Sequence, residues 1–206
     1  MSIVSNLALT FWILGATLLL PQYVLASEKL EIKLLDAVID EDIAKVKSLL
    51  KKGANPNSID ALYEKRTAMG WASQHKESEI LMLLIHAGGD VNLFNVKDSW
   101  SPYPLYNALM ADRIDNFKLL LAYGANPNAV DNNQRIPFMA AVASGDWEFA
   151  FLLLQAGTKL DFRNRWGETP KSVVENQGLR TDSEWRKKVF DFFTENGISL
   201  TSRVPL

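Results

Sequence analysis

Two histidines, His75 and His86, are the first residues to consider for chemistry, because imidazole serves as a general base and as a metal ligand near neutral pH. They lie eleven residues apart, and neither a cysteine nor a His-Glu-x-x-His pattern accompanies them. The sequence therefore predicts no metal site. We interpret His86 as a residue in the last turn of a helix, where a partly positive side chain suits the helix dipole.

Two other segments resemble catalytic or phosphate-binding elements. The run Asp40-Glu41-Asp42 offers carboxylates for acid–base chemistry, but it stands between two expected helices, where such residues cap the second helix. The glycine-containing run Gly53-Ala54-Asn55-Pro56-Asn57 follows a helix instead of opening one, so it does not cradle a phosphate. Neither Gly-x-x-x-x-Gly-Lys nor Gly-x-Ser-x-Gly occurs. We therefore expect no catalytic residue and no cofactor, and we predict that the protein is not an enzyme.

Composition narrows the class of protein further. The chain has 206 residues, with 22 Lys and Arg against 24 Asp and Glu, a net charge of −2 and 48% apolar residues. This length suits one domain or one short repeat array with a continuous core. The near-neutral charge gives no electrostatic reason to expect nucleic acid as a partner. The absence of cysteine excludes disulfides and thiol nucleophiles.

The N-terminal segment has the features of a targeting signal. Residues 1–26 carry no charged side chain, residues 7–20 are almost wholly apolar, and Val24-Leu25-Ala26 supplies the small residues that a signal peptidase reads. We predict a cleaved signal peptide and an exported, periplasmic domain over residues 27–206. The alternative is a membrane-anchored protein, because residues 3–26 are long enough to span a bilayer uncleaved. No asparagine lies in an Asn-x-Ser/Thr sequon, which favours a bacterial origin.

The rest of the chain repeats with a period near 33 residues. Sixteen residues before each of four glycines stands an alanine. The four pairs are Ala37 and Gly53, Ala72 and Gly88, Ala108 and Gly124, and Ala141 and Gly157. A fixed offset at this period marks a solenoid of stacked units. The predicted units are residues 30–57, 58–92, 93–128, 129–161 and 162–200.

One unit can be interpreted from its residues. A short helix around the alanine has a small face, against which a second helix packs closely. Apolar residues at helical spacing, such as Ile80, Leu81 and Leu84, mark the second helix. The glycine follows the last of them, where the chain must turn through a left-handed conformation. One helix pair cannot bury its own apolar side, so neighbouring pairs must stack.

These phrases resemble ankyrin repeats. The family phrase Thr-Pro-Leu-His-x-Ala is matched in part by residues 67–72, 103–108, 136–141 and 169–174, and the family ending Gly-Ala-Asp-x-Asn is close to Gly-Ala-Asn-Pro-Asn, which occurs twice. The resemblance implies an all-α fold. The expected architecture is an ankyrin-repeat solenoid of about five helix pairs with short β-hairpin loops.

The resemblance also implies protein binding through a concave strip on the first helices and through the hairpin tips. We call the alanines of the four Ala–Gly pairs the framing alanines. The concave strip consists of the residue before each framing alanine and the residues two and three after it. Its candidate contact residues are Trp71, Gln74, His75, Asn107 and Met110. The tip candidates are Tyr63, Trp100, Arg135, Arg165 and Trp166. Tryptophan is enriched at binding hot spots, but each indole could instead pack on a neighbouring hairpin.

The partner is left open by the sequence. The chain resembles exported bacterial ankyrin proteins of two kinds. One kind is associated with a catalase in oxidative-stress defence, and the other resembles immunity proteins that bind an antibacterial toxin. The resemblance therefore implies either a catalase or a toxin as the partner. The competing hypothesis is a membrane-anchored scaffold that uses residues 3–26.

Overall fold

A computed structural model describes residues 28–60, 66–94, 103–177 and 183–201. The expected signal segment and two candidate contact residues, Tyr63 and Trp100, lie outside these ranges. Among the described helices, none is long and apolar enough to cross a bilayer.

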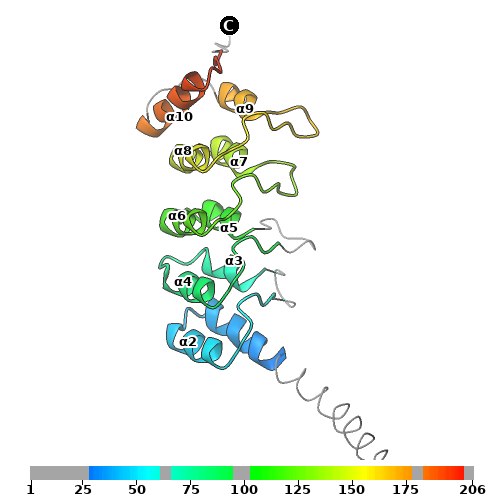
Figure 1. The fold of residues 1–206 in the computed structure, drawn as a ribbon, viewed down its shortest axis with the longest axis vertical. Helices are drawn as coiled ribbons and strands as arrows, with labels where there is room; N and C mark the ends of the chain where they lie inside the picture. Colours follow the sequence, from blue (N-terminus) through cyan, green and yellow to red (C-terminus); the bar gives the residue numbers. More distant parts are fainter. Residues whose placement is uncertain (1–27, 61–65, 95–102, 178–182, 202–206) are drawn as a thin grey trace, which may run out of the picture.

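The described helices form five pairs stacked in one column (Figure 1), as the sequence predicts. The first helices of the pairs are residues 28–39, α3 (Ala68–Ala72), α5 (Pro104–Met110), α7 (Pro137–Ser144) and α9 (Pro170–Asn176). The second helices are α2 (Ile43–Lys51), α4 (Glu79–His86), α6 (Ile114–Ala122), α8 (Trp147–Gln155) and α10 (Glu184–Glu195). The first and second helices form separate columns, and the loops between units project on the side of the first helices (Figure 1).

The repeated phrases determine where the helices begin and end. Proline occupies the first position of α5, α7 and α9, where its missing N–H costs nothing. Thr67 and Thr169 cap α3 and α9, and Asp42 caps α2 by accepting the Lys45 N–H at 2.9 Å. The second helices of the first four units end at glycines that are all left-handed: Gly53, Gly88, Gly124 and Gly157, with φ of 87°, 88°, 85° and 94°.

The loops between units differ from the expected β-hairpins. Within the described residues, regular strands are absent, and the one isolated antiparallel bridge joins Ile59 and Thr67. Its hydrogen bonds run from Asp60 N–H to Arg66 O and from Ala68 N–H to Ser58 O, both at 2.8 Å. The described loops are tight turns closed by one or two such bonds, which is too few for a ladder of strand pairs.

The four framing alanines are completely buried, in agreement with their predicted place at helix contacts. The same core contains large side chains that are fully buried, among them Phe117, Phe138 and Phe193. Phe117 meets Phe149 edge to face, with ring centroids 4.8 Å apart. The core is therefore one continuous strip of apolar side chains that runs through all five pairs.

A ladder of asparagine side chains joins successive units at their C-terminal turns. The backbone N–H groups of Asp90, Asn126 and Lys159 donate to the Oδ1 atoms of Asn57, Asn92 and Asn128, at 2.7, 2.7 and 2.8 Å. Each asparagine thus accepts an N–H that no helix of the next unit satisfies. The asparagine that closes the repeated Gly-Ala-Asn-Pro-Asn phrase is explained by this contact between neighbours.

Replacing Asn92 with alanine tests the ladder. Asn92 accepts from Asn126 and also donates through Nδ2 to Gly124 O at 2.9 Å, so the variant loses two contacts between units. We expect a loss of about 1–2 kcal/mol in the free energy of unfolding, because each such bond contributes about 0.5–1.5 kcal/mol net. Urea unfolding followed by circular dichroism measures it. Asn92→Asp keeps the acceptor and should lose less; equal stability of all three proteins would contradict the ladder's role.

The last pair departs from the others. α10 packs against α8 of the preceding unit, and Phe193 lies 5.9 Å from Phe138, centroid to centroid. The buried Arg186 guanidinium covers the Trp147 ring at 4.7 Å and donates to Gln177 O at 3.2 Å. The last helix therefore leans across its neighbour and covers the apolar end of the stack.

Candidate functional site

The concave strip places three candidate residues in one polar network. Gln74 follows α3, and its Nε2 donates to Asn107 Oδ1 on α5 at 3.1 Å. The Arg66 guanidinium bonds to Gln74 Oε1 and covers the Trp71 ring, with its carbon 4.4 Å from the centroid. Trp71 itself is partly buried against the core. This arrangement fixes the indole in one orientation on the strip.

A glycine allows this close approach. Gly70 occupies the position of the family's histidine, and a Cβ placed on it would lie 2.8 Å from Arg66 Cγ and 3.0 Å from Asn107 Nδ2. Any larger residue would push these two side chains apart. Arg66 was not among the expected site residues, although its place just before a helix cap is visible in the sequence.

Two expected contact residues, Asn107 and His75, are buried instead of facing solvent, with 1% and 8% of their surface exposed. Asn107 supports the network by donating through Nδ2 to Tyr103 O at 3.1 Å. The His75 carbonyl accepts Asn116 Nδ2 at 2.8 Å. Burial lowers the pKa of His75, against the opposing charge of Glu41, so the ring is neutral at pH 7. Burial removes both residues from the set that a partner could contact.

Met110 is the most exposed large apolar side chain of the described strip. It is the last residue of α5, and 64% of its surface is open to solvent. It occupies the same position of its unit as Gln74 does in the preceding one. A partner lying along the strip would therefore meet Trp71 in one unit and an exposed apolar side chain in the next.

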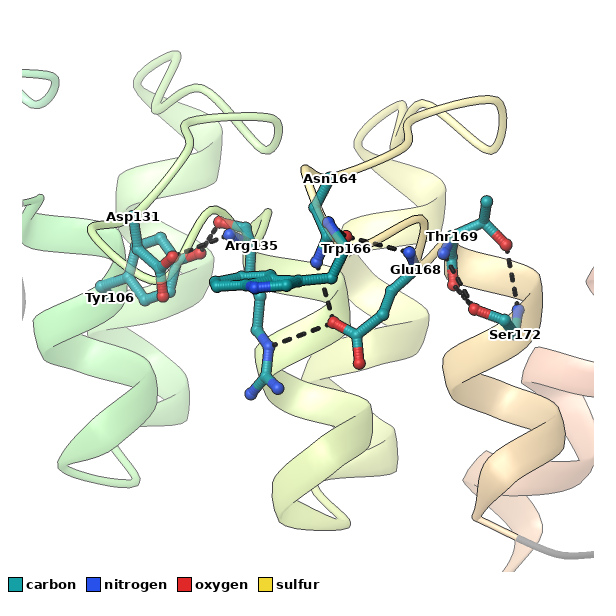
Figure 2. A network of polar contacts seen from close by, with 8 residues as sticks. All are labelled: Tyr106, Asp131, Arg135, Asn164, Trp166, Glu168, Thr169 and Ser172. Carbon is teal, nitrogen blue, oxygen red and sulfur yellow. Dashed lines mark hydrogen bonds and ion pairs between the residues drawn. The ribbon is translucent and has the colours of Figure 1, made fainter.

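The tips of the fourth and fifth units hold the other described candidates, of which Figure 2 shows Arg135 and Trp166. Arg135 Nε lies 3.8 Å from Glu168 Oε2, which links the two tips. Tyr106 on α5 donates its hydroxyl to Arg135 O at 2.6 Å and so links the third unit to the fourth. Arg165 covers the Trp166 ring, with its carbon 4.3 Å from the centroid, and 55% of Trp166 is exposed.

The ionisable groups of this network are structural. Burial raises the pKa of the Tyr106 phenol, and the nearby Asp131 carboxylate raises it further. Burial also raises the pKa of Asp131, whose Oδ1 accepts the Arg135 N–H at 2.8 Å. In the part of the chain that the structure describes, no three His, Asp or Glu side chains gather as metal ligands would. The arrangement supplies contact surface, hydrogen bonds and cation–π pairs.

Helix pairs stacked in one column and joined by short turns define an α-solenoid repeat protein. The particular family follows from comparison with known sequences. Residues 34–131 match the family described as ankyrin repeats (3 copies). This stretch of the chain consists of ankyrin repeats, which generally bind proteins and are typically non-catalytic.

Known relatives share the repeats. The transient receptor potential cation channel subfamily A member 1 of Homo sapiens is 31% identical over 131 residues, which are 64% of this chain and 12% of the channel. An ankyrin repeat protein of fowlpox virus is 27% identical over 71% of this chain and 19% of its own. The cyclin-dependent kinase inhibitor 2A of Monodelphis domestica is 39% identical over 29% and 36%. The chain therefore spans well under two thirds of these relatives' lengths.

Proposed function

We propose that this chain is an exported, periplasmic module that binds a protein partner non-covalently through its concave strip. The partner classes that the sequence suggests are a catalase and an antibacterial toxin. The alternative is a membrane-anchored scaffold held by residues 3–26. Membership of a family that generally binds proteins supports the binding role.

The observation that carries the proposal is the indole of Trp71, covered by Arg66, on the same strip as the exposed Met110. Arg66 covers the ring, and Gln74 bonds both to Arg66 and to Asn107. A side chain that is already ordered loses little entropy when a partner covers it. Met110 extends the apolar contact on the next helix. Hot spots have this composition: an aromatic anchor surrounded by contacts that exclude water.

Two methionines test which face binds. Met110 lies on a first helix, whereas Met82 lies on the second helix α4 with 40% of its surface exposed. Met110→Gln should weaken binding about tenfold, because a buried methionine contributes about 1.5 kcal/mol or more to a contact. Met82→Gln should leave affinity unchanged. The measurement is isothermal titration with the partner recovered by pull-down and mass spectrometry; a loss caused only by Met82→Gln would place the interface on the other face.

Location is tested separately from binding. The exported hypothesis expects the protein recovered from cells to begin at Ser27, as read by intact mass. A full-length N-terminus in the membrane fraction would instead support the anchored scaffold. A reading frame for a catalase or for a secreted toxin beside the gene would distinguish the two partner classes.

A further inference from the structure

We define the fifth-unit tip as Arg163, Arg165 and Trp166. The last two lie in the turn 164–167, which has the same pattern of hydrogen bonds as the fourth-unit turn 131–134. In both turns the fourth residue donates its N–H to the carbonyl of the first at 3.0 Å. In both, the side chain of the first residue accepts the N–H of the residue just after the turn, at 2.8 and 2.9 Å. The first residues are similar, Asp131 and Asn164, and the last residues, Gln134 and Gly167, both adopt a positive φ. The two central residues are Asn132 and Asn133 in one turn and Arg165 and Trp166 in the other.

This match shows that the turn does not require tryptophan. Asn133 occupies the position of Trp166 and the same hydrogen bonds form around it. Trp166 keeps more than half of its surface exposed and projects from the turn on the side of Arg135 (Figure 2). The turn forms with asparagine at this position, so folding does not explain why a large indole is exposed to water here. Contact with a ligand would explain it.

The tip also carries positive charge that its surroundings do not neutralise. Among the described residues, Arg163 and Arg165 have no carboxylate within ion-pairing distance. The nearby Glu168 accepts Asn164 Nδ2 at 2.8 Å and pairs with Arg135, so it is already engaged. Arg165 lies against one face of the Trp166 ring and exposes its guanidinium edge. The tip therefore presents an apolar ring and unpaired cationic donors at one place.

The tip is rigid before any ligand arrives. Asn164 Oδ1 accepts two backbone N–H groups, from Trp166 at 3.0 Å and from Glu168 at 2.9 Å. Arg163 Nη1 donates to Gly167 O at 2.8 Å and ties the two arms of the turn together. A pre-ordered aromatic and cationic surface loses little conformational freedom on binding.

We infer that the fifth-unit tip binds an acidic segment of the partner protein, with carboxylates on Arg163 and Arg165 and an apolar side chain on Trp166. The inference rests on the proposed function and adds the chemistry of the partner. Guanidinium groups favour carboxylates because paired N–H donors match their two oxygens. An anionic membrane is disfavoured, because the tip holds one indole and the whole chain carries a net charge of −2.

The test uses the neighbouring turn as its template. The double variant Arg165→Asn, Trp166→Asn gives the fifth turn the central residues of the fourth and should melt like the wild type. Tyr123→Asn is the matched control, because it removes a similarly exposed ring, 47% open, from the column of second helices. A displayed random peptide library is selected on the full chain and on each variant, and vesicles of phosphatidylcholine with phosphatidylglycerol are tested in parallel.

We expect the wild type to enrich peptides in which Asp or Glu adjoins an apolar residue. Their affinity should fall about tenfold in the double variant and as salt rises, and should not change in Tyr123→Asn or Met110→Gln. The inference is overturned if the selected peptides show no enrichment of Asp or Glu, or if the double variant binds them as well as the wild type does. It is also overturned if the tip is needed for binding to the vesicles and no peptide binds. If acidic peptides still bind the tip but Met110→Gln does not weaken binding of the partner protein, only the proposed concave-strip interface is overturned.

Discussion

Replacing Phe117 with alanine is expected to lower the free energy of unfolding by about 3–5 kcal/mol, the usual effect of removing a buried phenylalanine. Phe117 lies on α6 in the middle of the stack and is completely buried. Its ring meets Phe149 of the next unit at 78°, 4.8 Å between centroids, so the variant leaves a cavity between two units and breaks an aromatic pair.

The effect should exceed that of a matched change near the end of the array. Phe192 lies on α10 and is only partly buried, so Phe192→Ala removes less buried surface and affects one interface. Because solenoid stability is close to a sum of units and nearest-neighbour interfaces, a central unit is coupled on both sides. Urea unfolding followed by circular dichroism measures both variants. A loss below about 1 kcal/mol for Phe117→Ala would show that the site repacks without a cavity.

Much of the fold could be predicted from the sequence because its signals are local. The offset from each framing alanine to its glycine depends on one helix pair, and the structure confirms the buried alanines and the left-handed glycines. The cap Asp42 and the helix-end position of His86 also follow from neighbours in the chain. The left-handed turn between the two helices of a pair cannot be predicted from a glycine where none is present. Glu41 and Asp112 adopt a φ of 56° there although neither is glycine.

The candidate site was harder to predict because its contacts join residues about 33 positions apart. The bond from Gln74 to Asn107 and the approach of Arg66 over Gly70 depend on how two units stack. Position in the repeat predicts that Asn107 faces the strip, but only the stacked neighbours show that it is buried there. The lean of α10 onto α8 likewise follows from apolar surface left at the end of the stack.

Replacing Trp71 with alanine is expected to weaken partner binding by about 2 kcal/mol or more, roughly thirtyfold in the dissociation constant. Among the described concave-strip candidates, Trp71 carries the one aromatic ring that is not buried, because the imidazole of His75 is only 8% exposed. Arg66 covers the indole and bonds to Gln74. Truncation removes the anchor and also leaves the Arg66 guanidinium without the ring that it covers. Isothermal titration with the recovered partner measures affinity, and thermal melting measures the fold.

Because Trp71 is partly buried, its two roles must be separated. Trp71→Leu keeps apolar volume against the core but lacks the ring face that Arg66 covers. If Trp71 anchors the partner, leucine should restore most of the melting temperature lost in the alanine variant while affinity stays low. If leucine restores both, the indole serves the core and the interface lies elsewhere. A leucine variant that melts and binds like the wild type would therefore move the search from the strip to the fifth-unit tip, where Trp166 is exposed and the turn folds without it.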